Sequence, residues 1–563
     1  MFTSGHGRAR RPHHVPAARL NVGRYVVAVT FFLAAGMGAL LVGAQPPAQA
    51  DALADKSEPL LRQRLATRPL PRATSVIVTI AGHLTPGKEQ RLKSLGGDIY
   101  RHLSLIHAVA LRLPTRRLPR LAALPFVAHL SQDWQVKPED AFTVGHSTAD
   151  IAYQYGYTGL GVTVAVVDSG IYPHPDLYDP ATGRWRILAQ VNFVSTALNA
   201  NDQYGHGTHV AGIIAGNGAS STGSNYYRTF YGIARRANLV NVRVLDANGN
   251  GSASAVIAGI QWVVRYKTTY NIRVINLSLG HPVTEHYTTD PLCQAVEQAW
   301  KAGIVVVCAA GNDGRLYPAP VAGANNEGYG TSYGTIYSPG NDPYVISVGA
   351  MKNYNGTRAY DRIATYSSRG PALLDWVVKP DLVTPGNQVI SLRCPNSTLG
   401  VTEANHIVSP SYYMIHPTVL SSSAYFEMSG TSLAAPVVSG AVALLLQANP
   451  YLSPDTIKVR LLVSATRWRF PDGTADACTF GAGYLYIMGA LACRSVATGY
   501  ALSPTLTRDS QGNITLNANM AIWGTTAIWG TQTTWGTQAL WTDYHQTWRE
   551  SKASALPILE NEQ

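Results

Sequence analysis

The segment 428-MSGTSLAAP-436 leads into an uncharged apolar run at residues 437–446. The run consists of small and branched apolar residues and is longer than two turns, which predicts a buried helix. Ser432 would then stand on a glycine turn at the helix start, where backbone N–H groups and the helix dipole stabilise a developing negative charge. Pro436 fits near such a start, since a missing donor costs least there. The alternative is a buried helix that Thr431 or Ser432 merely caps. A nucleophilic serine also needs a base and an orienting acid.

The positive charge of the chain is confined to its first quarter. The net charge is +11 over 563 residues, a length that allows two to four domains. Residues 1–140 hold 19 Lys and Arg against 8 Asp and Glu, whereas the other residues hold 25 of each kind. A phosphate-binding surface on the main domain has no compositional support, so we expect no nucleic acid partner.

The cysteines do not predict a metal site. None of the five has the spacing of a zinc finger. Cys308 lies inside an apolar run and is expected to be a buried free thiol. Cys478 and Cys493 could form a disulfide in an exported protein, a question that the sequence leaves open.

Residues 1–50 have the pattern of a secretory signal peptide. Five arginines between positions 8 and 24 precede the apolar stretch 25–44, and the small-residue site Ala48-Gln49-Ala50 follows. We therefore expect export with cleavage after Ala50. Because the apolar stretch is nearly long enough to span a bilayer, an uncleaved membrane anchor is the alternative.

Two structural domains are expected after this leader. Residues 51–140 predict a small α+β domain, with strands at 76–80, 106–113 and 126–130, helices at 85–95 and 115–124, and a polar linker at 131–140. Residues 141–498 predict an α/β domain with a parallel sheet. Its short apolar runs, typical of strands buried on both faces, are 162–167, 239–245, 274–279, 304–310 and 344–348, with helices expected at 209–215, 252–266 and 293–302.

Polar residues stand where sites form in such a sheet, at the ends of strands. Asp168 ends one apolar run and is either a buried acid or a helix-capping Asp. His206 and His209 begin a helix of small residues. A metal site would use both, but it lacks an obvious third ligand, whereas a catalytic base at His206 fits the glycines on both sides of it. Asn312 ends another run and is either an oxyanion donor or a turn residue.

Four motifs resemble the subtilisin-like serine proteases (subtilases): VAVVDSGI at 164–171, GHGTHVAG at 205–212, AAGND at 309–313 and MSGTSLAAP at 428–436. The resemblance extends over about residues 145–490. It implies an α/β fold with a parallel sheet flanked by helices. It also implies Asp168 as orienting acid, His206 as general base, Ser432 as nucleophile, and Asn312 with the Ser432 backbone N–H as oxyanion donors.

The resemblance further implies how peptides bind. Substrates would add as a strand beside Leu277, Ser278, Leu279 and Gly280 on one side and Gly249, Asn250 and Gly251 on the other, with Ala309, Ala310 and Gly311 also in contact. The small Ala253 suggests an open distal pocket. Asp313 either favours a basic side chain in the primary pocket or is a solvated turn residue, and the insertion 323–334 is a candidate for the pocket floor.

The partners and cofactors follow from the same resemblance. Residues 51–140 resemble a propeptide that acts as intramolecular chaperone and inhibitor, with its tail in the cleft and self-cleavage around 133–145. The mature protein is expected to be a monomer that acts on proteins or peptides. The chemistry needs no cofactor. Asp176 matches a calcium ligand of some subtilases, but the segment 217–230 does not match the loop that supplies the other ligands, so a complete oxygen cage is not evident.

The tail, residues 499–563, departs from the family. Trp523, Trp529, Trp535 and Trp541 recur every six residues, so in an extended chain they share one face. This strip either packs on the catalytic domain or binds a surface, glycan or partner. We expect a secreted, self-activating serine endopeptidase. The alternatives are a narrow-specificity processing protease and a catalytically silent scaffold that binds through the tail.

Overall fold

The computed structural model describes residues 47–57, 61, 65, 70–103, 107–132, 142–317, 330–353, 357–418, 422–508, 510, 514–517 and 552–555. The chain forms two compact units, Met1–Val136 and Lys137–Gln563. The tryptophan repeats at 523–548, most of the expected processing region 133–145 (residues 133–141) and most of the insertion 323–334 lie outside the described residues.

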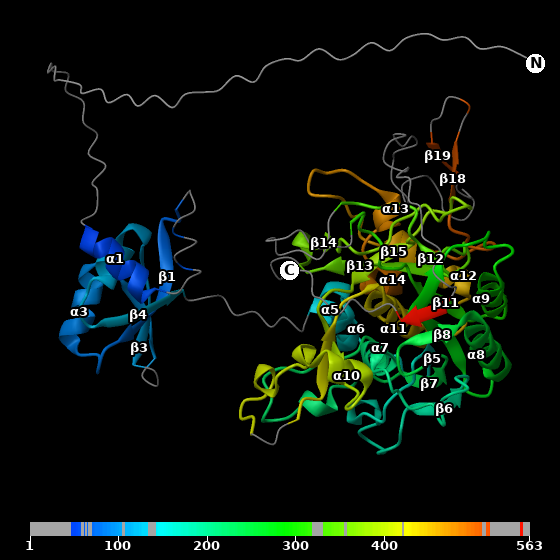
Figure 1. Cartoon of the computed structure of the whole chain (residues 1–563), viewed down its shortest axis with the longest axis horizontal. Coiled ribbons are helices and arrows are strands. Elements are labelled where there is room, and N and C mark those ends of the chain that lie inside the picture. The colour runs from blue at the N-terminus through cyan, green and yellow to red at the C-terminus, as the bar shows by residue number, and fades with distance from the viewer. Residues whose placement is uncertain are drawn as a thin grey trace, which may run out of the picture. The chain divides into compact units, whose positions relative to one another are not determined.

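The first unit is a four-stranded antiparallel sheet with helices (Figure 1). Its elements are α1 (Pro47–Lys56), β1 (Ala73–Ile80), α3 (Pro86–Ser94), β2 (Asp98–Leu103), β3 (Ala108–Pro114), α4 (Leu118–Ala122) and β4 (Val127–Gln132), and the strand order is β2-β3-β1-β4. Alternate residues of β1 are buried, so one face of the sheet carries the core. The helix expected at 115–124 is instead a 3₁₀ turn followed by the short α4. Helix α1 runs through the expected signal cleavage site after Ala50.

The second unit is built on a mostly parallel sheet, as the sequence predicts. Its order is β14-β13-β11-β9-β5-β7-β6, and β15 also pairs with β13. The strands are β5 (Thr163–Asp168), β6 (Ile187–Asn192), β7 (Asn238–Arg243), β9 (Ile272–Leu277), β11 (Val305–Ala309), β13 (Ile346–Lys352), β14 (Arg362–Ile363) and β15 (Leu382–Pro385). Only β14 is antiparallel among the described strands of this sheet. Strands β5 and β11 are buried at every position, which explains their uninterrupted apolar sequences.

Helices cover this sheet. The long ones are α7 (His206–Ala215), α8 (Ala253–Tyr266), α9 (Pro291–Lys301), α11 (Thr431–Ala448) and α12 (Pro454–Ser464); short ones are α5 (Phe142–Ser147), α6 (Ala149–Gln154), α10 (Thr398–Thr402), α13 (Ala477–Phe480) and α14 (Ile487–Ala492). Helix α11 packs on α7 and on the central strands, and α8 packs on α9. In the described part of the chain, α11 alone is long and apolar enough to cross a membrane, but 89% of that stretch is buried inside the unit, so it is a core helix.

A smaller antiparallel sheet lies in the same unit, with strand order β12-β10-β20-β8. Its strands are β8 (Asn250–Ser252), β10 (Leu279–Pro282), β12 (Tyr337–Ser338) and β20 (Lys552–Ala555). Two antiparallel pairs complete the second unit: β16 (Val389–Leu392) with β17 (Tyr425–Met428), and β18 (Thr505–Arg508) with β19 (Ile514–Asn517). All five cysteines are free thiols, Cys478 and Cys493 included, and Cys308 is fully buried as expected.

Candidate active site

His206 and Asp168 form a buried pair at the carboxyl end of β5. Asp168 is the last residue of β5 and His206 is the first residue of α7. The Nδ1 atom of His206 lies 2.8 Å from Asp168 Oδ1, and both side chains are fully buried. Because the carboxylate can only accept, Nδ1 carries the proton and Nε2 is left as the basic nitrogen. Nε2 has no hydrogen-bond partner among the described residues, so it is available to a hydroxyl brought beside it.

The loop before His206 is held by Asp202, a residue that the sequence interpretation missed. Its carboxylate accepts hydrogen bonds from the backbone N–H groups of Tyr204, Gly205 and Thr208 and from the hydroxyls of Thr208 and Ser169. Burial raises the pKa of Asp202, and these hydrogen bonds oppose the rise. The only sequence signal was an Asp shortly before a helix start, which is typical of capping.

Gly207 lets the start of α7 approach the Asp168 loop. A Cβ atom at Gly207 would lie 2.2 Å from the carbonyl oxygen of Gly170, too close for any side chain. The N–H of Gly207 donates to Ser169 Oγ at 2.9 Å. The second glycine beside His206 is thus required by close backbone packing.

Ser432 is in the first turn of α11, which begins at Thr431. The helix therefore starts six residues before the predicted run, and the expectation that Pro436 stands near its start is wrong: Pro436 lies inside the helix. A proline there cannot donate to the carbonyl four residues earlier, which belongs to Ser432. The Ser278 hydroxyl donates to that carbonyl instead, at 2.6 Å. This bond ties the amino end of α11 to the segment between β9 and β10.

Asn312 is fixed beside the same helix end. Its Oδ1 accepts hydrogen bonds from the backbone N–H and from the hydroxyl of Thr431, both at 3.0 Å. These two bonds turn the amide oxygen toward Thr431 and so set the orientation of the NH₂ group. The Thr431 hydroxyl also receives the N–H of Gly311 at 3.1 Å. Asn312 is thereby held against Thr431, the residue before Ser432, whose backbone N–H is the other predicted oxyanion donor.

His209 has a structural position. Its Nε2 lies 2.9 Å from the carbonyl oxygen of Phe426 and 3.1 Å from that of Val389, so it donates to the backbone. Burial lowers the pKa of His209 to about 3, which keeps the ring neutral. Among the described residues no group of three or more His, Cys, Asp or Glu side chains is arranged to hold a metal ion. The two histidines of α7 have therefore separate partners and do not form a metal pair.

The remaining predicted substrate residues lie in or beside β8 and β10, which border one slot, or at the ends of β9 and β11. Asn250 and Gly251 lie in β8, with Gly249 just before it. Leu279 and Gly280 lie in β10, and Ser278 precedes them. Leu277 and Ala309 end β9 and β11, and Ala310 and Gly311 follow. β8 and β10 are not paired with each other, because β20 lies between them and pairs with both.

Tyr337 fills the space between two of these segments and was not predicted. An ideal Cβ on Gly280 would lie 3.5 Å from Tyr337 Cδ2, and one on Gly311 would lie 2.9 Å from Cδ1. The two edges of the ring therefore face the two glycines. The hydroxyl donates to Asp313 Oδ2 at 2.6 Å, and the backbone N–H donates to Ala310 at 3.0 Å. No local sequence signal points to this contact, since three distant segments make it.

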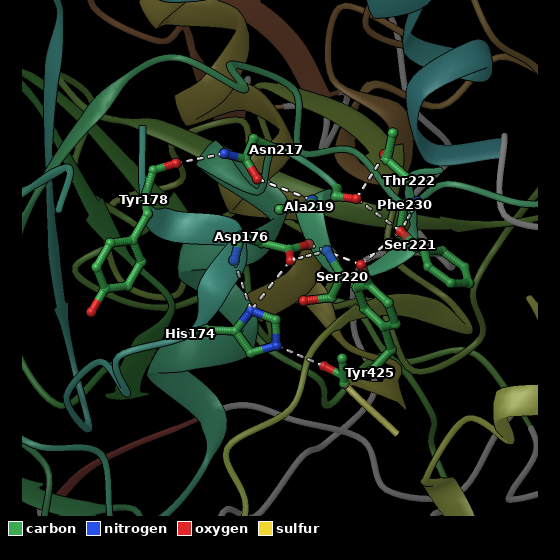
Figure 2. Close-up of polar contacts among 12 residues, drawn as sticks. His174, Asp176, Tyr178, Asn217, Ala219, Ser220, Ser221, Thr222, Phe230 and Tyr425 are labelled. Carbon is green, nitrogen blue, oxygen red and sulfur yellow. Dashed lines mark hydrogen bonds and ion pairs between the residues drawn. The ribbon is translucent and has the colours of Figure 1, made fainter. Parts of the chain in front are cut away.

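Asp176 is enclosed by hydrogen-bond donors (Figure 2). Its Oδ1 accepts the Ser220 backbone N–H at 2.7 Å and its Oδ2 accepts the Tyr425 hydroxyl at 2.9 Å. Tyr425 also lies 2.7 Å from Ser221 Oγ. Its hydroxyl stays protonated, because burial and the charge of Asp176 raise its pKa. N–H and O–H groups present hydrogen rather than lone pairs to the carboxylate, so this donor set does not fit a calcium cage.

His174 completes the surroundings of Asp176 (Figure 2). Its Nε2 lies 3.0 Å from the carbonyl oxygen of Ala424, and its Nδ1 accepts the Asp176 backbone N–H at 3.2 Å. Nδ1 also lies 3.6 Å from Asp176 Oδ1, a distance that would suit an ion pair. Burial lowers the pKa of His174 despite the nearby carboxylate, and an accepting Nδ1 carries no proton, so the ring is neutral and the contact is not an ion pair.

The chain is similar to known serine proteases. A family model described as "Subtilase family" matches residues 159–484. The serine protease AprX of Bacillus subtilis (strain 168) is 37% identical over 361 residues, which cover 63% of this chain and 72% of the relative. Subtilisin E of the same organism is 31% identical over 69% of this chain and 83% of its own length. An extracellular serine proteinase of a Thermus species is 33% identical over 67% of this chain and 76% of its own length.

Proposed function

The chain belongs to the subtilase family and is a serine endopeptidase, and from this premise we propose that Ser432 is its nucleophile, His206 its general base and Asp168 the acid that orients the histidine. The observation that carries the proposal is the buried 2.8 Å hydrogen bond between His206 and Asp168. This hydrogen bond lies at the carboxyl end of the parallel sheet. Hydrogen bonds with Ser278 and Asn312 attach the start of α11 to the same end of the sheet.

The reaction would proceed through an acyl-enzyme. Ser432 Oγ attacks the scissile carbonyl while His206 Nε2 takes its proton and then returns it to the leaving amine. Asp168 holds the imidazole in the required tautomer and stabilises its charged form. The tetrahedral oxyanion receives hydrogen bonds from the Ser432 backbone N–H and the Asn312 amide, where the dipole of α11 adds to their effect. Water then hydrolyses the ester by the same steps.

Peptide substrates would bind in the slot between β8 and β10. Each strand turns one edge toward the slot, so an extended peptide in the place of β20 would gain backbone hydrogen bonds on both sides. Neighbouring strands are about 4.8 Å apart, so two edges separated by one strand accept one extended chain and no more. This geometry favours peptide bonds in flexible or unfolded segments of proteins.

The first unit is assigned as a propeptide of an exported enzyme. Its compact antiparallel fold and its position before the family domain support an inhibitor and chaperone role. Export is supported by the basic and apolar leader and by an extracellular relative. We expect the full chain, purified beside its Ser432→Ala variant, to lose the mass of the N-terminal unit while the variant stays whole. Intact-mass spectrometry measures this. Equal trimming of both chains would show that another protease makes the cut.

The primary pocket is assigned a preference for small side chains. The substrate residue whose carbonyl group acylates Ser432 must lie beside Asn312. The segments that contain Gly280 and Gly311 would therefore flank the side chain of this substrate residue. Tyr337 already occupies the space between those two glycines. Ala or Ser before the scissile bond would therefore be accepted better than Phe or Leu.

Substitution of Tyr337 tests this preference. In Tyr337→Ala we expect kcat/KM for a peptide with Phe before the scissile bond to rise about 10–100-fold relative to its Ala counterpart, the scale on which pocket shape discriminates apolar groups. Tyr337→Phe, which keeps the ring and loses only the hydroxyl at Asp313, is the matched control and should retain the small-residue preference. A wild-type enzyme that already prefers Phe would contradict the assignment.

The site around Asp176 is assigned as a hydrogen-bonded substitute for a calcium site. Tyr425→Phe removes one donor from a buried carboxylate, so we expect the free energy of unfolding to fall by about 1.5–3 kcal/mol. Tyr227→Phe, which loses a bond from an exposed hydroxyl to the Ser411 carbonyl, should change it far less. Denaturation in urea measures both. A large fall in the wild-type melting temperature on adding a calcium chelator would instead favour a bound calcium.

A further inference from the structure

The slot between β8 and β10 is occupied by the chain's own C-terminal region. β20, the red arrow in Figure 1, lies between the two strands, because the strand order of this sheet is β12-β10-β20-β8. Ser554 is opposite both Asn250 of β8 and Gly280 of β10. One four-residue segment therefore uses both edges that the proposed function assigns to substrate.

The direction of β20 is that of the acyl part of a substrate. It runs antiparallel to both neighbours, and its last residue, Ala555, is opposite Leu279. Leu279 follows Ser278, whose hydroxyl is bonded to the Ser432 carbonyl. The segment thus approaches the nucleophile with increasing residue number, as residues on the amino side of a scissile bond must do.

The catalytic side chains are covered in this state. Asp168, His206 and Ser432 are each 0% exposed. A protein substrate cannot form the same backbone pairing with β8 and β10 while β20 holds their edges. The three residues after Lys552 are Ala, Ser and Ala, which are small and not β-branched. The attachment of this segment therefore rests on backbone pairing rather than on large side chains in pockets.

We propose that Lys552–Ala555 is an intramolecular ligand of the substrate slot and competes with substrate for it. The proposal rests on the proposed function, because it takes the slot to be the substrate site. A tethered segment acts at an effective concentration in the millimolar range, so weak backbone pairing suffices for partial occupancy. Such a ligand raises the apparent KM and leaves kcat unchanged, since saturating substrate displaces it.

The kinetic test uses the full chain with one substitution. Ser554→Pro removes a backbone N–H from a strand with neighbours on both sides, where proline is not accommodated. Ser554→Ala keeps that N–H and is the matched control. With a soluble tetrapeptide amide as substrate, we expect the apparent KM of Ser554→Pro to be about three- to tenfold lower than that of wild type and of Ser554→Ala, with equal kcat. Equal KM values in all three chains would overturn the proposal.

A second measurement does not depend on catalysis. In the Ser432→Ala background, amide hydrogen exchange of residues 250–252 and 279–280 should be slow with Ser554→Ala and distinctly faster with Ser554→Pro. Equal exchange would overturn the proposal, because another segment or none would then protect these strands. If no chain hydrolyses peptides, the proposed function fails, while the exchange experiment still decides whether β20 occupies the slot.

Discussion

Replacing Ser432 with Ala is expected to lower kcat for peptide hydrolysis about 10⁶-fold, the loss that removal of the nucleophile causes in subtilisins. The variant keeps the start of α11, its backbone N–H and the Ser278 hydrogen bond to the residue's carbonyl. Substrate binding should therefore survive with little change in KM. Steady-state kinetics with a peptide amide, after purification away from any contaminating protease, provides the measurement.

Ser439→Ala is the matched control for this loss. Ser439 is buried in the same helix, and its hydroxyl donates to Asn276 Oδ1 at 2.8 Å. Its removal should lower stability and leave kcat within about twofold, since a single neutral hydrogen bond contributes only about 1 kcal/mol. If Ser432→Ala retained more than a small fraction of wild-type kcat, the assigned nucleophile would be wrong.

Asp168→Asn is expected to lower kcat about 10⁴-fold. An asparagine keeps the shape of the side chain, but its NH₂ group can face His206 Nδ1 as a donor. The ring would then carry its proton on Nε2, the nitrogen that must accept a proton from Ser432. The pH dependence of kcat/KM over the range in which histidine titrates should change together with the loss.

A second buried histidine–carboxylate pair supplies the control. His146 Nδ1 lies 2.8 Å from Asp361 Oδ2, the same distance as between His206 and Asp168. Asp361→Asn should destabilise the protein and leave kcat nearly unchanged. Comparable losses of kcat in both variants would mean that Asp168 acts on folding rather than on the tautomer of His206.

The elements that position the site could be predicted from local sequence. Short, mostly apolar runs identified β5, β9 and β11, because a strand buried on both faces lacks the polar alternation of a half-exposed strand. Asp168 and Asn312 were found because the polar residue after such a run lies at the edge where sites form. The glycines around His206 pointed to close packing, which Gly207 makes against Gly170.

Features that depend on distant partners could not be predicted. Pro436 can stand inside α11 only because the Ser278 hydroxyl replaces its missing donor. Tyr337 has its role because β10 and the end of β11 bring two glycines to its ring. β20 consists of only four residues, none of them β-branched or aromatic, so its pairing with β8 and β10 has no clear signal in the sequence.

Some errors were local. Strand β2 was not predicted. Its residues Tyr100, Arg101 and His102 form a polar stretch, which is identified as a strand only by its pairing with β3. Pro114 precedes the helix predicted at 115–124, and Pro119 lies within it. The chain forms a 3₁₀ turn there and then α4, whose second residue is Pro119. Proline is accepted at the first positions of a helix, which explains the later start.

Ser432 is proposed to be an activated nucleophile. The most direct test of this role is covalent labelling of the processed enzyme with a small organofluorophosphonate, which phosphonylates an activated serine with loss of fluoride. We predict one adduct per chain, mapped to Ser432 by peptide mass spectrometry, and almost none in Asp168→Asn, since the reaction needs the base that Asp168 orients. An adduct on another residue, or equal labelling of both chains, would contradict the account.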